Sequence, residues 1–178
     1  MARVRGLLVL ITVLVTAGCG DDQGSEVETD TPATITVSSE AFAEGDEVPE
    51  RFTCDGDGVS PPLEWSGEQG EAWALVVDDP DAPGGTCIHW VVLDIPSRTT
   101  SVGIGDVPAG GVQVANSSDE AAYAGPCPPS GEHQYRFTVY ALDAPTGLTE
   151  SASLDDALDA IGEHAKSHGT MTAVYSSP

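Results

Sequence analysis

Short apolar runs separated by turn-forming residues dominate the chain from about residue 35 to residue 175. Two of these runs, at 72–77 (AWALVV) and 90–95 (WVVLDI), are rich in β-branched and aromatic residues, which predicts strands buried on both faces. The Pro and Gly residues between them predict a loop. Weaker strand candidates at 35–37 and 170–175 bracket this region, so the pattern predicts a mainly β domain.

The run from Tyr135 to Leu142 has the two-residue alternation of a further central strand. One face would carry Tyr135, Phe137, Val139 and Ala141, and the other Arg136, Thr138, Tyr140 and Leu142. The three tryptophans are predicted core residues, namely Trp65, Trp73 and Trp90.

One segment near the C-terminus has helical periodicity. Ser153 followed by Asp156 is a capping-box-like start. Apolar residues then recur on one face, at Leu154, Leu158, Ile161 and Ala165. We expect this helix to cover a sheet. Its acidic residues near the N-terminus suit the helix dipole and are interpreted as solvated rather than as a metal cluster, namely Asp155, Asp156 and Asp159.

The first 18 residues have the organisation of a signal peptide, with Arg3 and Arg5 before an apolar stretch at 7–15 and small residues at its end. The stretch is shorter than the roughly 20 residues of a spanning helix. Cys19 follows as in a bacterial lipoprotein cleavage site, although Thr16 replaces the commoner Leu. We therefore expect lipid on Cys19 and anchoring at the extracytoplasmic face of the cell membrane. The alternative is ordinary secretion, with Cys19 incidental.

Composition divides the remaining chain into two parts. Residues 19–32 contain acids, Thr, Ser and Gly and almost no apolar residues, which predicts a flexible tether. Residues 33–178 are long enough for one domain with one sizeable core.

Charge narrows the choice of partners. The chain has 29 acidic against 6 basic residues. After loss of a signal peptide the basic residues would be Arg51, Arg98, Arg136 and Lys166. Such a surface excludes nucleic acid as a partner and repels anionic lipid, so membrane attachment would depend on the lipid at Cys19.

Two polar motifs adjoin the predicted strands. Residues 78–83 (DDPDAP) lead to His89-Trp90, and residues 125–135 (GPCPPSGEHQY) lead into the strand at 135–142. Side chains at the ends of strands could therefore converge on one pocket. Alternatively, Asp79 and Asp81 cap a turn, and His89 and His133 are buried structural residues. A metal site made of these four residues is a further alternative, but no tight His/Cys spacing supports it.

These motifs, together with 54–65 (CDGDGVSPPLEW) and 136–143 (RFTVYALD), resemble the phosphatidylethanolamine-binding protein family. The likeness is greatest to its bacterial Raf kinase inhibitor-like branch and runs from about Phe42 to the C-terminus. The resemblance implies an antiparallel β-sandwich with peripheral helices. It also implies a pocket for a small anion such as phosphate or a phospholipid headgroup.

Carried over by position, the resemblance places Asp79, Asp81, Pro83 and His89 on one wall of the pocket and Pro129, His133 and Tyr135 on the other. The acids would orient or charge the histidines, because a carboxylate facing a phosphate is repulsive. The family also suggests a cis bond before Pro83. Where the family has His-Arg-Tyr, this chain has His133-Gln134-Tyr135, so a fixed positive charge is missing.

Three further cysteines follow Cys19. In an oxidising compartment we expect one disulfide and one remaining thiol. Cys54 and Cys127 lie inside family-like motifs and are the first pairing, while Cys87 is the alternative partner.

Motifs for catalysis are missing from the sequence. It has no Gly-x-Ser-x-Gly elbow, no Gly-rich phosphate loop and no His-Glu-x-x-His helix. We therefore expect a ligand-binding or regulatory module without a cofactor, and not an enzyme. Inhibition of a serine protease or kinase through a surface loop is a related function that the resemblance implies. The alternative is a hydrolase acting on phosphate esters.

Overall fold

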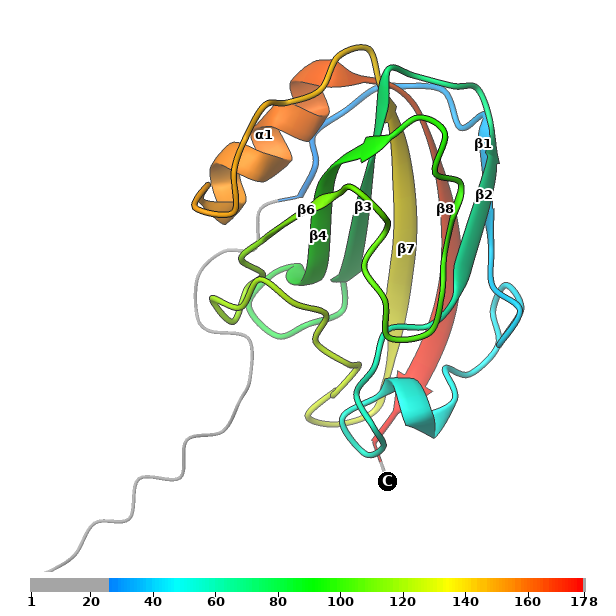
Figure 1. Ribbon diagram of the computed structural model, residues 1–178. Coiled ribbons are helices and arrows are strands. Elements are labelled where there is room, and N and C mark those ends of the chain that lie inside the picture. The colour runs from blue at the N-terminus through cyan, green and yellow to red at the C-terminus, as the bar shows by residue number, and fades with distance from the viewer. Residues whose placement is uncertain (1–25, 178) are drawn as a thin grey trace, which may run out of the picture.

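The computed structural model describes residues 26–177 of the chain as two antiparallel β-sheets and one α-helix (Figure 1). The five-stranded sheet has the order β6-β4-β3-β7-β8, and the three-stranded sheet has the order β1-β2-β5. The strands are β1 (Ile35–Ser38), β2 (Leu63–Gly67), β3 (Ala72–Asp79), β4 (Cys87–Pro96), β5 (Ser101–Val102), β6 (Val112–Val114), β7 (Glu132–Leu142) and β8 (Ala165–Ser176). The helix α1 spans Leu154–His164, and a 3-10 turn, η1, spans Glu50–Phe52.

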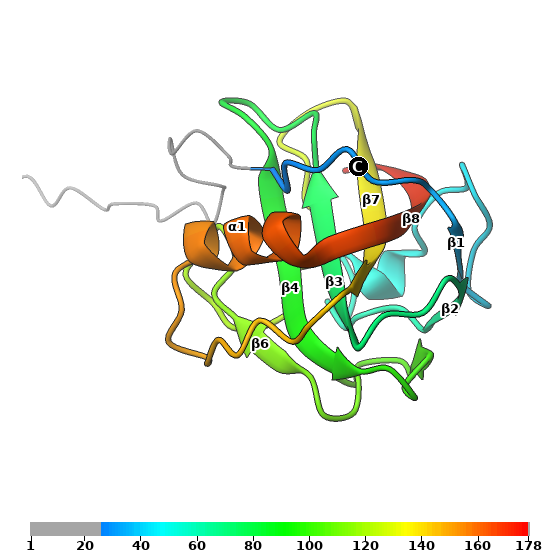
Figure 2. The same ribbon diagram turned by 90° about the horizontal axis from the view of Figure 1, so that it is seen from above.

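The elements form three layers. Figure 1 and Figure 2 show α1 on one side of the five-stranded sheet and β1 and β2 on the other. One apolar cluster fills the space between the two sheets and includes all three tryptophans. A second cluster lies between the five-stranded sheet and α1. The sheet is therefore covered on both faces, which explains why every residue of β3 is buried.

The faces of β7 agree with the sequence pattern. Tyr135, Phe137, Val139 and Ala141 belong to the cluster between the sheets, whereas Tyr140 and Leu142 belong to the cluster under α1. The prediction of a central strand is confirmed, because β7 pairs with β3 on one side and β8 on the other.

The helix begins as expected and ends earlier. The Ser153 hydroxyl accepts a hydrogen bond from the backbone N–H of Asp156 and donates one to its carboxylate. The buried apolar face contains Leu158 and Ile161. The helical assignment of Ala165 is wrong, because α1 ends at His164 and Ala165 begins β8. The strand candidate at 170–175 therefore extends further toward the N-terminus, as a partner along the whole of β7.

Residues 26–34, here named the strap, run along the outer face of the five-stranded sheet beside α1. They fall mostly within the segment whose composition predicts a tether. Val27 packs against the apolar cluster under α1, and Ala33 forms an isolated bridge to His168 of β8. The predicted signal peptide and Cys19 lie outside the described residues. Within residues 26–177, no helix has the length and apolar character needed to cross a membrane.

Candidate ligand-binding site

A cavity of about 700 Å³ opens at one end of the five-stranded sheet, where β3 ends and β4 and β7 begin. Antiparallel pairing brings these three strand ends together, with Asp78 opposite both Ile88 and Arg136. The lining residues come from these strand ends and from three loops. They are Cys54, Asp79, Ala82, Pro83, Cys87, Ile88, His89, Ser118, Glu120, Ala124, Gly125, Cys127, Pro128, Pro129, His133 and Tyr135.

A buried hydrogen bond joins His133 to Asp79. His133 Nδ1 lies 2.8 Å from Asp79 Oδ2, and both side chains are more than nine-tenths buried. Since a carboxylate oxygen accepts, Nδ1 carries the proton. The same Asp79 uses Oδ1 to accept a hydrogen bond from the backbone N–H of Asp81 at 2.9 Å. Asp79 therefore fixes the orientation of one imidazole and the start of the β3–β4 loop together.

The second imidazole is oriented by the backbone. His89 Nδ1 lies 2.9 Å from the carbonyl oxygen of Ala124, so this nitrogen also carries a proton. Burial lowers the pKa of His89 below its ordinary value. The Ala124 carbonyl and the charges of Asp79 and Asp78 oppose that shift but are smaller in effect. Near neutral pH His89 is therefore uncharged.

Both imidazoles present their second nitrogen to the cavity. Nε2 of His89 and of His133 has no hydrogen-bond partner within the described part of the chain, yet neither atom is among its fully buried unpaired atoms. Because each Nδ1 holds the ring proton of the neutral form, each neutral Nε2 is an acceptor. Protonation converts the same atom into a charged donor.

Tyr135 lines the cavity together with the two histidines. Its ring packs edge-on against His89, with the ring centroids 5.4 Å apart. Burial, followed by the charge of Asp79, raises the pKa of its hydroxyl well above the ordinary value. The hydroxyl therefore remains protonated, beside the carboxylate of Asp79 and the backbone of Cys127.

The structure places Asp81, a predicted site residue, and Gln134, where the family has arginine, outside the cavity lining. Asp81 does not line the cavity, and its Oδ2 accepts a hydrogen bond from the backbone N–H of Gln134 at 2.9 Å. It thus ties the β3–β4 loop to the start of β7 rather than orienting a histidine. Gln134 is exposed and alternates with the inward-facing His133 and Tyr135. An arginine at this position would therefore point away from the cavity.

Pro83 and Pro129 both line the cavity, as the sequence analysis expects. The expectation of a cis bond before Pro83 is wrong, because every described peptide bond is trans. The turn instead places positive φ angles at Gly84 and Gly85, which follow Pro83 directly.

A disulfide joins Cys54 to Cys127 and confirms the first predicted pairing. It connects the loop after η1 to the loop before β7, and the backbone N–H of Cys54 also donates to the carbonyl of Pro126. Gly125 is needed at this crossing, since a Cβ there would lie 2.8 Å from the carbonyl carbon of Thr53. The expectation of a remaining thiol is wrong, because the described part of the chain has no free cysteine.

The loop at 115–124 supplies lining residues that the sequence analysis did not identify. Ser118, Glu120 and Ala124 line the cavity. The buried side chain of Asn116 holds this loop, accepting from the N–H groups of residues 118 and 120 and donating to the carbonyls of residues 89 and 122. Asn, Ser and Asp in succession are a turn signal that could have indicated a built loop.

The charges around the cavity are unusual for an anion site. Asp79 and Glu120 are acidic, and no Lys or Arg is among the lining residues. Arg136 lies close in sequence, but it pairs with Asp78 through two bonds of 2.8 and 2.7 Å on the opposite face of the sheet. No group of three or more metal-ligating side chains occurs in residues 26–177. The imidazoles are therefore the groups that can supply positive charge here.

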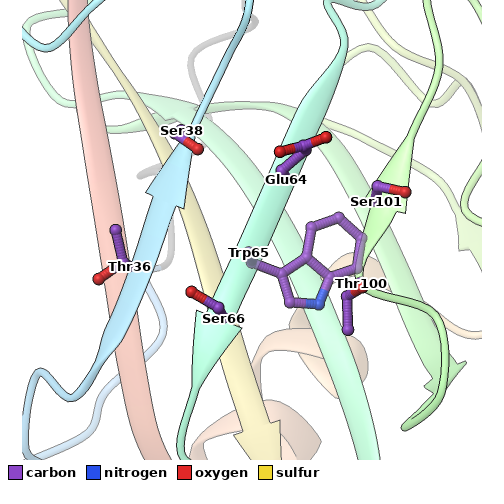
Figure 3. Close-up of a pocket in the computed structure, with 7 residues that line it drawn as sticks. All are labelled: Thr36, Ser38, Glu64, Trp65, Ser66, Thr100 and Ser101. Carbon is purple, nitrogen blue, oxygen red and sulfur yellow. The ribbon is translucent and has the colours of Figure 1, made fainter.

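A second hollow, of about 250 Å³, lies on the outer face of the three-stranded sheet (Figure 3). Its lining consists of small hydroxyl residues with Glu64 and the largely buried Trp65, and contains no histidine or cysteine. The outer residues pair across strands, with Thr36 opposite Ser66 and Ser38 opposite Glu64. This arrangement is typical of a solvated sheet face, and it contains none of the predicted site residues.

Comparison with known proteins identifies the family of the chain. The sequence model described as phosphatidylethanolamine-binding protein matches residues 38–176. A "UPF0098 protein" of Methanothermobacter thermautotrophicus is 41% identical over 148 residues, covering 79% of this chain and 98% of the relative. Among solved structures, Escherichia coli YbcL, described as a new member of the mammalian PEBP family, has a TM-score of 0.76 at 29% identity. That match covers 82% of this chain and all of YbcL.

Some relatives also match the N-terminal region. The Mycobacterium tuberculosis protein named "Putative lipoprotein LppC" is 39% identical over 185 residues, covering 93% of this chain and 92% of the relative.

Proposed function

Because the chain belongs to the phosphatidylethanolamine-binding protein family, we propose that it binds a small phosphate-type group in the cavity between His89 and His133, while anchored to a membrane through Cys19. The observation that carries this proposal is the arrangement of the two imidazoles. Each has Nδ1 occupied by a protein acceptor and Nε2 open to the same cavity.

The protonation state of each Nε2 decides which form of the phosphate group the imidazole can bind. A neutral Nε2 accepts, so it pairs with a protonated phosphate oxygen but opposes a fully ionised one. An imidazolium Nε2 donates to an ionised oxygen through a charge-assisted bond. Since burial keeps His89 neutral at ordinary pH and no Lys or Arg lines the cavity, binding is weak near neutrality and strengthens in acid.

The size and walls of the cavity favour a ligand larger than inorganic phosphate. A volume of about 700 Å³ lies within the range of small-molecule sites. Much of the wall is apolar, contributed by Ala82, Pro83, Ile88, Ala124, Pro128 and Pro129. A phosphate ester with an organic substituent, such as a phospholipid headgroup, would contact both the imidazoles and these apolar residues.

Anchoring is proposed from the N-terminal sequence. Cys19 follows a charged start, an apolar stretch and small residues, and the similarity to the relative named as a lipoprotein extends over 93% of this chain. Export through such a signal would place the domain outside the cytoplasm.

Binding without turnover is the better-supported function. The His133–Asp79 pair resembles the base and orienting acid of a hydrolase, but no hydrogen bond joins either imidazole to a hydroxyl nucleophile within the described residues. The hydroxyls at the cavity belong to Ser118 and Tyr135. The raised pKa of Tyr135 disfavours its phenolate, so a phosphate-ester hydrolase remains only the alternative.

The test is an NMR titration of the purified Cys19→Ser chain with inorganic phosphate and with phosphoethanolamine at pH 5.5. We expect shifts at His89, His133 and Tyr135. His89→Asn and His133→Asn should each weaken binding by about tenfold, because the amide replaces the Nδ1 bond but not Nε2.

His164→Asn is the matched control, since this partly exposed histidine lies outside the cavity and pairs with Asp143 at the end of α1. It should leave the affinity unchanged. Shifts that map outside the cavity, or equal losses in the control, would overturn the proposal. Release of phosphate over many turnovers from an ester, lost in His89→Asn and His133→Asn, would establish the hydrolase instead.

A further inference from the structure

The strap is fastened at the cavity end of the sheet. The Glu26 carboxylate accepts a hydrogen bond from the Thr86 hydroxyl and lies 3.4 Å from Arg136 Nη2. Thr86 ends the β3–β4 loop and precedes Cys87, which lines the cavity. Arg136 is itself held by its two bonds to Asp78, the neighbour of Asp79.

The remainder of the strap is held along its length. Val27 packs against the apolar cluster under α1. Further on, the Thr31 hydroxyl lies 3.1 Å from His168 Nδ1, and the backbone N–H of His168 donates to the carbonyl of Pro32. These contacts combine apolar burial, side-chain bonds and backbone bonds, so the strap is a packed part of the domain.

Strand register gives the direction of the strap. β1 begins at Ile35, opposite Gly67, which precedes the connection to the start of β3 at Ala72. β3 then runs from this far end of the sheet to Asp79 at the cavity. Followed from Ile35 toward the N-terminus, the strap therefore runs from the far end of the sheet to the cavity end, where Glu26 lies.

We propose that the strap makes the cavity end of the domain face the membrane that holds the lipid on Cys19, so that the ligand is a headgroup of that membrane. This proposal rests on the anchoring in the proposed function. Seven residue steps separate Cys19 from Glu26 and span at most about 25 Å. Were the strap detached, sixteen steps would lead from Cys19 to Ile35, a reach of about 55 Å from the far end.

Charge does not orient the domain toward the membrane by itself. The strongly acidic chain is repelled by anionic headgroups, and its few basic residues form no membrane-facing patch within the described residues. Orientation then depends on where the tether leaves the folded domain. The eight residues of β3 span about 25 Å, which is the distance between the cavity end and the far end of the sheet. When the strap is fastened, the tether leaves from the cavity end, so this end of the sheet lies nearer to the bilayer.

The experiment compares two fluorophore positions in the lipidated full chain on phosphatidylcholine vesicles that contain an acceptor-labelled lipid. Ser130, next to cavity-lining Pro129, reports on the cavity end, and exposed Gln69 reports on the far end. Each donor is introduced as a noncanonical amino acid, so that the cysteines are not disturbed. We expect higher energy transfer from position 130 than from position 69.

The double variant Glu26→Arg and Val27→Asp should detach the strap, because it places like charges together and a carboxylate against the apolar cluster. We expect the difference between the two positions to disappear or reverse. Glu64→Arg with Ser66→Asp makes the same charge change on the exposed outer face of β2 and should preserve it.

Equal energy transfer from positions 130 and 69 in the wild-type chain would overturn the inference. So would a higher transfer from position 130 that persists in the strap variant. Phosphate titration of the same variants separates this result from a failure of the proposed function. Because no strap residue lines the cavity, binding of free phosphate should be unchanged when orientation is lost.

Discussion

His133 Nδ1 lies 2.8 Å from Asp79 Oδ2, although 54 residues separate them in the sequence. The bond joins the start of β7 to the end of β3 and leaves only Nε2 of His133 for a ligand. In His89, likewise, Nδ1 is occupied by the carbonyl of Ala124 and only Nε2 is left for a ligand. The cavity thus has two imidazoles with one tautomer each, one fixed by a carboxylate and the other by the backbone.

The tautomers can be observed directly. At pH 7.5 we expect long-range ¹⁵N–¹H spectra to show His89 in the Nδ1–H form with an unprotonated Nε2, because the Ala124 carbonyl can only accept. His164 is partly exposed, pairs with the exposed carboxylate of Asp143 and serves as the internal reference. A neutral His89 protonated at Nε2 would contradict the geometry on which the proposed function depends.

Acid should have opposite effects on stability and on binding. Burial lowers the pKa of His89, so below about pH 6.5 the unfolded chain takes up a proton that the folded chain does not. The free energy of unfolding should therefore fall as the pH falls from 6.5 through the folded-state pKa. Phosphate affinity should rise over the same interval, by about tenfold as His89 becomes charged.

Urea denaturation and phosphate titration at several pH values measure both effects. His89→Asn should remove its share of each pH dependence, and His164→Asn should remove neither. An affinity that stays constant between pH 7.5 and pH 5, together with unchanged stability differences between wild type and His89→Asn, would show that His89 does not titrate in the cavity.

Much of the fold follows from local pattern. The alternation at 135–142 predicted which side chains of β7 face each cluster, because a two-residue period is unambiguous when both faces are buried. The short strands β5 and β6 were not predicted. β5 has two residues and β6 has three, so neither offers a measurable period, and pairing with β2 and β4 defines them.

The site was only partly accessible to sequence reasoning. His89, His133 and Asp79 could be placed together because their motifs adjoin predicted strands. The roles of Asp81 and Ala124 could not be predicted, because both depend on backbone groups that the side-chain pattern does not reveal. Asp81 accepts from the backbone N–H of Gln134, and Ala124 acts through its own carbonyl. The direction of Gln134 depends on β7 beginning at Glu132, before the residue at which the sequence analysis began the strand.

The Cys54–Cys127 disulfide should contribute strongly to stability. It closes a loop with a sequence separation of 73, which corresponds to about 4 kcal/mol in the chain-entropy model. Replacing both cysteines with Ser should lower the free energy of unfolding by an amount of that order and weaken phosphate binding, because the bond holds two cavity loops together. A double variant with wild-type stability in urea would contradict this account.

Membrane association should depend on Cys19. The described domain has no helix able to cross a membrane, and the acidic chain disfavours anionic surfaces. Cys19→Ser should move the protein from the membrane fraction to the soluble fraction, since covalent lipid supplies about 0.8 kcal/mol per buried methylene. Retention of the variant in washed membranes, at the level of wild type, would show that a different surface holds the protein there.

Gly125 offers a test of how closely the cavity depends on its loops. A Cβ at this position would lie 2.8 Å from Thr53 C and 2.9 Å from Phe52 O, both of which are backbone atoms that cannot rotate away. Gly125→Ala should therefore displace the loop at 124–129, at a cost of about 1–3 kcal/mol in the free energy of unfolding. The displacement would move the Ala124 carbonyl that orients His89, so phosphate affinity at pH 5.5 should fall and the His89 tautomer should become mixed.

Ser130→Ala, on the same loop and exposed, is the control and should change neither quantity. Wild-type affinity in a destabilised Gly125→Ala protein would mean that the carbonyl of Ala124 does not position the imidazole for the ligand.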